Sequence, residues 1–175
     1  MHSGSPSSAQ EKRAALTALF ETHFERVSRY IAVRIGVRSE AEDLASEVFV
    51  RALQSVDSYR ETGAPMEAWV FRIAHNIVVD HLRRRGRRPG SVPLDDAPPV
   101  SYTPNPGAHL ERQEELRELH RALEQLSEAQ RQVLALRFGA DLSSEEAAQT
   151  MGKKPGAIRE MQSAAVKKLR SILSP

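Results

Sequence analysis

Arginine is concentrated in one short stretch of this 175-residue chain, residues 83–88, which read RRRGRR. The helix dipole would account for one or two cations at a helix C-terminus, each stabilising by about 0.3–1 kcal/mol. Five arginines in six positions with no acidic neighbour repel one another unless an anion lies among them. We therefore predict that this run binds nucleic-acid phosphates. The alternatives are a nuclear-localisation tract and a surface for an acidic protein partner.

A second concentration of positive charge begins at residue 153, although the net charge of the chain is only +2. Residues 108–152 carry 5 basic and 9 acidic side chains, whereas residues 153–175 carry 6 basic and 1 acidic. A helix-turn-helix shows this pattern when an acidic support carries a basic helix toward DNA. Such a helix has outward side chains that can read base edges, here Lys154, Arg159, Glu160, Gln162 and Ser163. A merely solvated helix face is the alternative.

The sequence contains none of the catalytic motifs that would indicate an enzyme. The chain lacks HExxH, both Gly-rich phosphate-binding motifs and G-x-S-x-G. Its six histidines do not pair at metal-ligand spacing, and its carboxylates stand where helix capping or solvation explains them. Cysteine is absent, which excludes disulfides, thiolate zinc sites and cysteine nucleophiles. We therefore expect no enzyme activity, no cofactor and no metal.

The elements that position these charges are predicted to be helices, because apolar residues recur at helical spacing almost throughout. After a disordered lead-in at 1–10, residues 11–88 are predicted to form a first domain of three helices. The first helix is predicted over residues 11–37. The second begins at a capping box formed by Ser39 and Glu42, and the third runs from Pro65 to about Arg85. On the second helix, Val50 interrupts a charged face, which predicts a partner surface or, alternatively, a solvated face with one stray valine.

Residues 89–107 hold six of the ten prolines and no lysine or arginine, so we predict a linker between two small domains. Residues 108–175 are predicted to form the second domain, with a leucine-seamed helix, capping boxes at Ser127 and Ser143, and a last helix opened by Pro155. The fold class is therefore all-α, ending in a helix-turn-helix. The sequence contains no run of about 18 apolar residues, so it predicts no membrane span. The absence of cysteine suits a cytoplasmic protein.

Three segments, in this order, resemble the extracytoplasmic-function (group 4) family of bacterial sigma factors, the sigma-70-type initiation factors of RNA polymerase. AEDLASEVFVRAL (41–53) is similar to the helix with which that family binds core polymerase. AWVFRIAHNIVVDHLRRRGRR (68–88) is similar to its promoter −10 helix, and LSEAQRQVLALRFGADLSSEEAAQTMG (126–152) to the start of its −35-binding domain. The resemblance covers residues 16–173. It implies that 11–88 is a region 2-like domain and 108–175 a region 4-like domain.

The resemblance also implies roles for residues at the matching positions. Contact with the clamp helices of the largest polymerase subunit is implied for Asp43, Ser46, Glu47, Val50 and Arg51. Contact with the melted −10 element is implied for Arg60, Arg72, His75, Asn76, Arg83, Arg84, Arg85, Arg87 and Arg88. Contact with the duplex −35 element is implied for Lys153, Lys154, Arg159, Glu160, Gln162, Ser163 and Lys167. An anti-sigma factor is implied as a further partner.

The chain departs from the family pattern at a few of these positions. Ser46 stands where the family often has Gln, Glu160 where it usually has Ser, and Met161 or Ala164 where it usually has Arg. A weaker or different −35 contact is therefore expected. Two alternatives of other classes remain. A sigma-like module that binds an anti-sigma protein or polymerase without initiating would not need RRRGRR. A plain two-domain DNA-binding regulator would not need the face at 41–53.

Overall fold

The computed structural model describes residues 6–61, 64–86 and 106–174, and all regular structure in these ranges is helical, as the sequence predicts. The short elements are a 3-10 turn, η1 (Val56–Ser58), and a π-helical turn, η2 (Ala135–Gly139). The long elements are α1 (Pro6–Ile35), α2 (Arg38–Ser55), α3 (Met66–Gly86), α4 (Pro106–Glu124), α5 (Glu128–Leu134), α6 (Ser144–Met151) and α7 (Pro155–Leu173).

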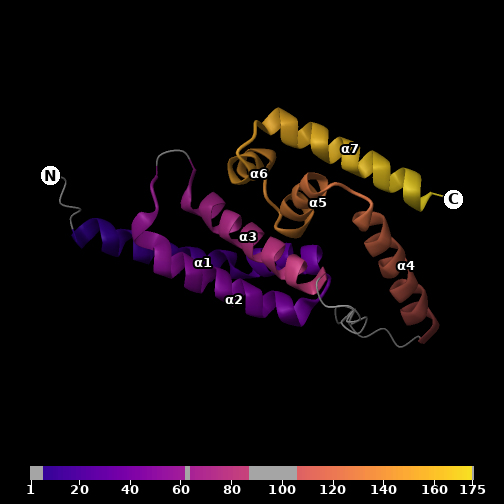
Figure 1. Ribbon diagram of the computed structural model, residues 1–175, viewed down its shortest axis with the longest axis horizontal. Helices are drawn as coiled ribbons and strands as arrows, with labels where there is room; N and C mark the ends of the chain where they lie inside the picture. The colour runs from indigo at the N-terminus through magenta and orange to yellow at the C-terminus, as the bar shows by residue number, and fades with distance from the viewer. Residues whose placement is uncertain (1–5, 62–63, 87–105, 175) are drawn as a thin grey trace.

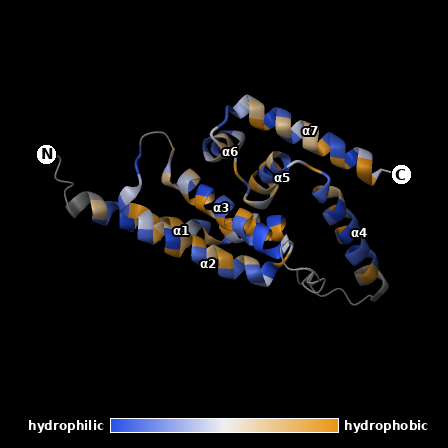
Figure 2. Ribbon diagram, in the orientation of Figure 1, coloured by the Kyte–Doolittle hydropathy of each residue, from blue (hydrophilic) through white to orange (hydrophobic). Residues whose placement is uncertain are grey.

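The first domain is a bundle of α1, α2 and α3, which lie side by side (Figure 1). Each helix turns one apolar stripe inward, and the hydrophobic colour gathers between them (Figure 2). Val27 and Ile31 of α1, Val48 of α2 and Val78 of α3 have no exposed surface. The Tyr30 and Phe71 rings meet edge to face with centroids 5.8 Å apart. The bundle is thus held by burial of its apolar side chains.

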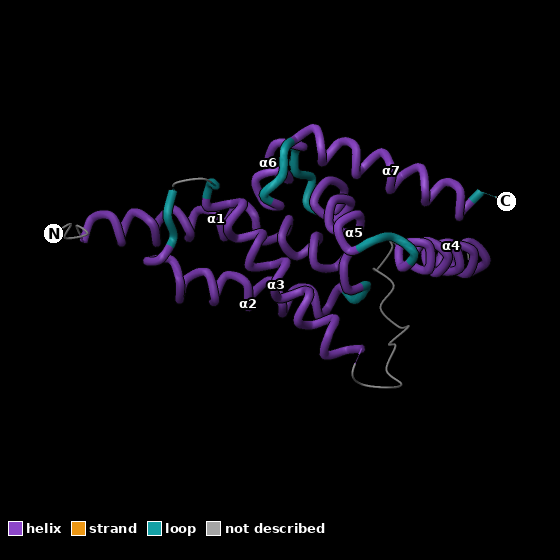
Figure 3. Tube along the Cα trace, turned by 45° about the horizontal axis from the view of Figure 1, so that its top comes forward, coloured by secondary structure: helices purple, strands orange, loops and turns teal. Residues whose placement is uncertain are grey.

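The second domain is built from α5, η2, α6 and α7, with α4 projecting away from the first domain (Figures 1 and 3). Both expected capping boxes form. The Ser127 hydroxyl accepts a hydrogen bond from the backbone N–H of Gln130, and the Ser143 hydroxyl accepts one from the backbone N–H of Glu146. In each box the Gln130 or Glu146 side chain accepts in return from the backbone N–H of the serine. Gly152 ends α6 in a left-handed conformation, φ 64°, and α7 begins at Pro155. Local residue chemistry therefore sets the sharp turn between α6 and α7.

Three predictions about the first domain and linker need correction. Helix α1 begins at Pro6, so residues 6–10 are helical rather than a disordered lead-in. Helix α2 begins at Arg38 with Val37 as its N-cap, and the Ser39 capping box does not form. Buried Val37 follows Gly36, whose φ of 76° turns the chain into α2 early. Helix α4 starts at Pro106, within the expected linker, and residues 87–105 lie outside the described ranges.

The two domains pack against each other and share one hydrophobic core. Buried residues of α1 and α3 belong to the same cluster as Leu136, Leu142 and Ile158 of the second domain. Helix α6 lies against α3, and η2 lies against α1. At this contact a Cβ on Gly139 would stand 3.1 Å from Val33 Cγ2, so the glycine lets η2 lie close to the side chains of α1. We call this contact surface, between α1 and α3 on one side and α5, η2 and α6 on the other, the seam.

Candidate nucleic-acid interface

The outward face of α2 combines an apolar pair with charges. Val50 and Leu53 are 54% and 55% exposed and stand three residues apart, on neighbouring turns of one face. The sequence analysis singles out Val50 alone on this face, so the exposed Leu53 makes the apolar patch larger than predicted. Arg51 donates to the Glu47 carboxylate beside it, and Asp43 and Ser46 are exposed. The five predicted polymerase-contact residues therefore lie on one accessible side of α2.

Aromatic side chains stand where the chain enters α3. The Tyr59 and Trp69 rings have centroids 5.2 Å apart, and the Tyr59 hydroxyl donates to the Ala64 carbonyl at 2.9 Å. Burial raises the pKa of Tyr59, and the nearby Glu61 carboxylate adds to this. Arg60 is exposed next to these rings in sequence. Tyr59 is buried and Trp69 is half-buried, so Trp69 is the ring with a face left for an unstacked base.

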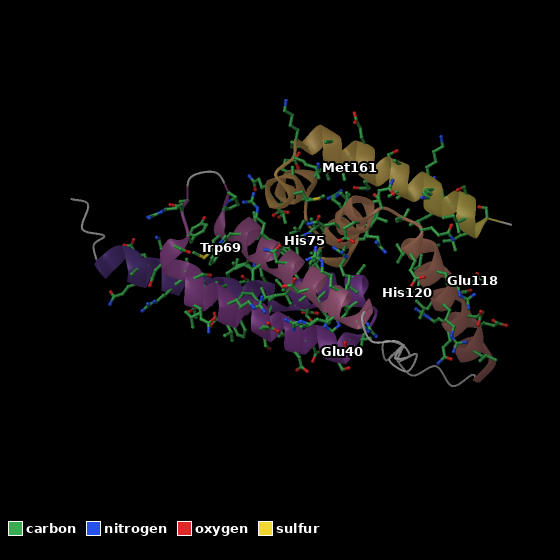
Figure 4. All side chains as sticks on the ribbon, viewed as in Figure 1. Glu40, Trp69, His75, Glu118, His120 and Met161 are labelled. Atoms are coloured by element: carbon green, nitrogen blue, oxygen red, sulfur yellow. The ribbon has the colours of Figure 1, made fainter. Side chains whose placement is uncertain are left out.

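The middle of α3 is engaged by the second domain. Arg72 donates from Nε to the Thr150 carbonyl at 3.1 Å and from Nη2 to the Gln149 carbonyl at 2.6 Å. His75 lies on the side of α3 toward the second domain (Figure 4), with its Nδ1 3.4 Å from the Tyr30 hydroxyl oxygen. Asn76 is exposed. Of the three predicted −10 residues in this stretch, two therefore already have partners within the protein.

Burial sets the protonation of this group. Desolvation lowers the pKa of His75 below its ordinary value, and the Arg34 guanidinium lowers it further, whereas Glu128 acts in the opposite direction. Burial likewise raises the pKa of Tyr30 to about 12. His75 is therefore neutral near pH 7 and contributes polar ring atoms rather than charge.

The arginine run at the end of α3 is divided in its contacts. Arg83 and Arg84 are exposed, as phosphate binding requires. Arg85 is half-buried and donates to the Ile35 carbonyl at the end of α1, at 3.0 Å. Arg87 and Arg88 lie outside the described residues. The structure thus leaves Arg83 and Arg84 as the available phosphate contacts of the described part of the run.

Helix α7 presents a basic face. Lys153, Lys154, Arg159, Glu160, Ser163 and Lys167 are exposed. Arg159 lies 3.6 Å from the Glu145 carboxylate, and half-buried Gln162 accepts from Arg137 Nε at 2.8 Å. Met161 packs toward the core, so its departure from the family pattern does not lie on the outward face (Figure 4).

A cleft beside α7 adds two cations to the predicted −35 residues: Arg170, one of the six basic residues of 153–175, and Arg137, which the sequence did not indicate. The cleft is lined by Arg137, Ser144, Arg159, Gln162, Ser163, Val166, Lys167 and Arg170. Arg137 also donates to the Leu142 carbonyl, which fixes its guanidinium next to α7. Arg170 could have been predicted on this face, because it lies at helical spacing from Lys167. Nothing in the residues around Arg137 predicts that its side chain lies beside α7.

Residues 6–61, 64–86 and 106–174 hold no cluster of three or more His, Cys, Asp or Glu side chains able to bind an ion. None of the helices in the same ranges has the length and apolar character needed to cross a bilayer.

Known families match both domains. The sigma-70 region 2 family matches residues 19–88, and the sigma-70 region 4 family matches residues 122–171. The chain is 39% identical over 140 residues to the ECF RNA polymerase sigma factor ShbA of Streptomyces griseus, covering 77% of this chain and 72% of ShbA. It is 35% identical over 161 residues to the ECF RNA polymerase sigma factor BldN of Streptomyces coelicolor, covering 91% of this chain but only 60% of BldN.

Two solved structures resemble the whole arrangement. CnrH, solved with the cytosolic domain of CnrY, superimposes with a TM-score of 0.65 at 25% identity, covering 94% of this chain and 91% of CnrH. RpoE of Bartonella quintana, solved with the anti-sigma factor NepR, superimposes with a TM-score of 0.64 at 25% identity, covering 90% of this chain and 95% of RpoE.

Proposed function

This chain belongs to the ECF family of RNA polymerase sigma factors, and on that premise we propose that it binds core RNA polymerase and directs transcription initiation at promoters with −10 and −35 elements. It acts as a DNA-binding initiation factor rather than as an enzyme, in the cytoplasm, where its polymerase would be. The roles of individual residues below are part of the same proposal.

The observation that carries the proposal is the exposed apolar pair on α2. Val50 and Leu53 are each more than half exposed, while the opposite side of the same helix is fully buried at Ala45, Val48 and Ala52. An exposed apolar centre with charged neighbours is typical of a protein–protein contact. Because a plain DNA-binding regulator has no use for this face, it favours a polymerase-binding factor over that alternative.

Helix α3 and the loop before it would hold the melted −10 strand. Arg83 and Arg84 would contact backbone phosphates, and the half-buried Trp69 ring would stack with an unpaired base. Arg60 and Asn76, both exposed, would supply hydrogen bonds to the same strand. A single strand suits this site, since it needs cations along a backbone and a surface for unstacked bases.

Helix α7 would read the −35 element as duplex. Its N-terminal half carries Arg159 and Glu160 outward, and Lys153 and Lys154 stand at the preceding turn, where phosphates pass a helix-turn-helix. Gln162 is half-buried and bonded to Arg137, so it is less available than its neighbour Ser163. Two modest DNA sites on one polymerase-bound protein reinforce each other through effective concentration.

An anti-sigma factor is the proposed negative regulator. RpoE of Bartonella quintana was solved with the anti-sigma factor NepR, and CnrH with the cytosolic domain of CnrY. The similarity of this chain to both over at least 90% of its length supports a regulator of the same kind.

Co-purification with core polymerase tests the proposal. Tagged protein incubated with purified core enzyme at low salt should retain the core subunits on the affinity resin. The same protein with Val50→Asp should retain much less, since a carboxylate would lie in the apolar centre of the contact. Wild-type protein that retains no core enzyme under these conditions would exclude a sigma factor and leave a plain DNA-binding regulator.

A further inference from the structure

The outward side of α7 carries a single carboxylate, that of Glu160. It is the only acidic residue in the stretch 153–175, which holds 6 basic side chains. Glu160 is exposed, and within the described ranges no hydrogen bond or ion pair engages its carboxylate. Helix α7 is not one of the elements that form the seam, so this side of the helix is accessible in the folded protein. The basic face of α7 therefore has a free carboxylate in its N-terminal half.

The neighbours of Glu160 along α7 explain why it is unpaired. A side chain on a helix meets those three and four residues away from it. For Glu160 these four positions hold small, uncharged residues: Gly156, Ala157, Ser163 and Ala164. Lys167 stands on the same side of the helix, but two turns further on, about 10 Å along the axis. The oxygens of the Glu160 carboxylate are therefore left open to an incoming hydrogen-bond donor.

The cations around Glu160 lie where they would hold the DNA backbone. Arg159 is turned about 100° around the helix axis from Glu160, and its Nη1 lies 3.6 Å from Glu145 Oε1 of α6. Further cations line the cleft beside α7, namely Arg137, Lys167 and Arg170. The N-terminal half of a recognition helix enters the major groove while cations beside it contact phosphates. A duplex held in this way would bring a base edge against the Glu160 carboxylate.

The hydrogen-bonding pattern of the major groove decides which base suits this carboxylate. An ionised carboxylate can only accept hydrogen bonds. Guanine presents the acceptors N7 and O6 in the major groove, and thymine presents the acceptor O4, so both would repel it. Adenine has the N6 amino donor beside the acceptor N7, whereas cytosine presents the N4 amino donor alone. Cytosine is therefore the base whose edge best matches a side chain that only accepts.

We propose that Glu160 makes the −35 site select a cytosine, whose N4 amino group donates a hydrogen bond to the Glu160 carboxylate in the major groove. This inference rests on the proposed function and names a base that its −35 site selects. The negative charge disfavours every duplex, because it repels phosphates, and the hydrogen bond from cytosine offsets that cost at one position only. Glu160 thus discriminates among bases by repulsion as well as by attraction.

Base selection in the −35 region tests the inference. The probe is a library of duplex fragments that keep the −10 element of a promoter transcribed with the wild-type protein and carry random bases over the −35 region. Core polymerase with the full-length protein binds the library, and the bound fragments are sequenced. With wild-type protein, one position should show cytosine on one strand enriched at least about fivefold over each other base. Glu160→Gln removes the charge and adds a donor, so this enrichment should fall below about twofold while other positions keep their preferences.

A matched control separates base reading from a general effect of charge. Glu118→Gln removes an exposed carboxylate from α4 (Figure 4) and should keep the wild-type preference at every position. If Glu160→Gln keeps the cytosine enrichment and only binds all fragments more tightly, the carboxylate merely repels phosphates and the inference is overturned. Wild-type protein that selects a −35 sequence without such a cytosine also overturns it, and both results leave the proposed function intact. Wild-type protein that selects no −35 sequence would instead contradict the assignment of α7 to the −35 element.

Discussion

Arg34 of α1 and Glu128 of α5 form an ion pair that joins the two domains across 94 positions of sequence. The Arg34 side chain is 2% exposed and that of Glu128 is 46% exposed. Arg34 Nη1 also lies 3.4 Å from the Tyr30 hydroxyl oxygen. A guanidinium so deeply buried requires a compensating charge, and the second domain supplies it. The first domain therefore depends on the second for the stability of its own α1.

Glu128→Gln should destabilise the folded protein. The change keeps the shape of the side chain but leaves the Arg34 charge without its partner, which should lower the free energy of unfolding by about 1–3 kcal/mol. Urea denaturation followed by circular dichroism measures this. Glu124→Gln is the matched control, because Glu124 lies 3.8 Å from His120 in an exposed pair worth less than about 1 kcal/mol. Equal losses for the two variants would contradict a special role for Arg34 and Glu128.

Acidification should destabilise the folded protein through His75. Its pKa is lowered in the folded protein, chiefly by burial and further by Arg34, against the opposing effect of Glu128. The unfolded chain binds the proton more tightly, so the contribution of His75 to the free energy of unfolding is fully present above the ordinary pKa of about 6.5. It then declines as the pH falls from there toward the lowered pKa.

Urea denaturation measures this loss as a fall in the free energy of unfolding between about pH 7.5 and about pH 5.5. His75→Gln removes the titrating group, and Tyr30, the ring that His75 faces, does not titrate in this range. The fall should therefore be smaller in the variant. An unchanged fall would assign the effect to another group.

Val50→Asp should weaken core binding without unfolding the protein. The side chain is 54% exposed, so the change costs little in the free protein but places a charge in the apolar centre of the proposed contact. We expect the dissociation constant for core polymerase to rise at least about tenfold, or ~1.4 kcal/mol. Leu173→Asp, at a 42% exposed leucine of α7, is the control and should leave the constant within about twofold. Equal effects at both sites would mean that α2 is not the contact.

Arg83→Ala with Arg84→Ala should reduce the salt dependence of DNA binding. Both side chains are exposed, and each lost phosphate contact on a single strand lowers the slope of log affinity against log salt by about 0.7. Fluorescence anisotropy over a salt series gives that slope. Arg117→Ala on α4 removes an exposed arginine paired with Glu114 and should leave it unchanged. A double variant with the wild-type slope would show that the run binds something other than DNA.

Features set by neighbouring residues were predictable from the sequence. The capping boxes of Ser127 and Ser143 depend on residues within one helical turn, and they form as expected. The Ser39 box is wrong for the opposite reason. Burial of Val37 against residues distant in sequence moves the start of α2 to Arg38, and this packing outweighs a cap worth about 1 kcal/mol.

Contacts between distant segments were not predictable. Arg72 was expected on a DNA-binding face, but its partners Gln149 and Thr150 stand 77 and 78 positions away. Arg137 reaches Gln162 from 25 positions away, and neither residue signals this locally. Composition predicts a proline-rich linker between two domains, but the packing of α6 on α3 depends on complementary surfaces that helical periodicity does not encode.

Transcription in vitro tests most directly whether this chain gives core RNA polymerase its promoter specificity. Core enzyme alone and core enzyme with this protein are compared on a library of genomic promoter fragments, and the transcripts are sequenced at their 5′ ends. We predict defined start sites only when the protein is present, preceded by shared −10 and −35 sequences. Transcript patterns that are the same with and without the protein, while it is bound to core enzyme, would contradict a sigma factor and indicate a module that binds polymerase without initiating.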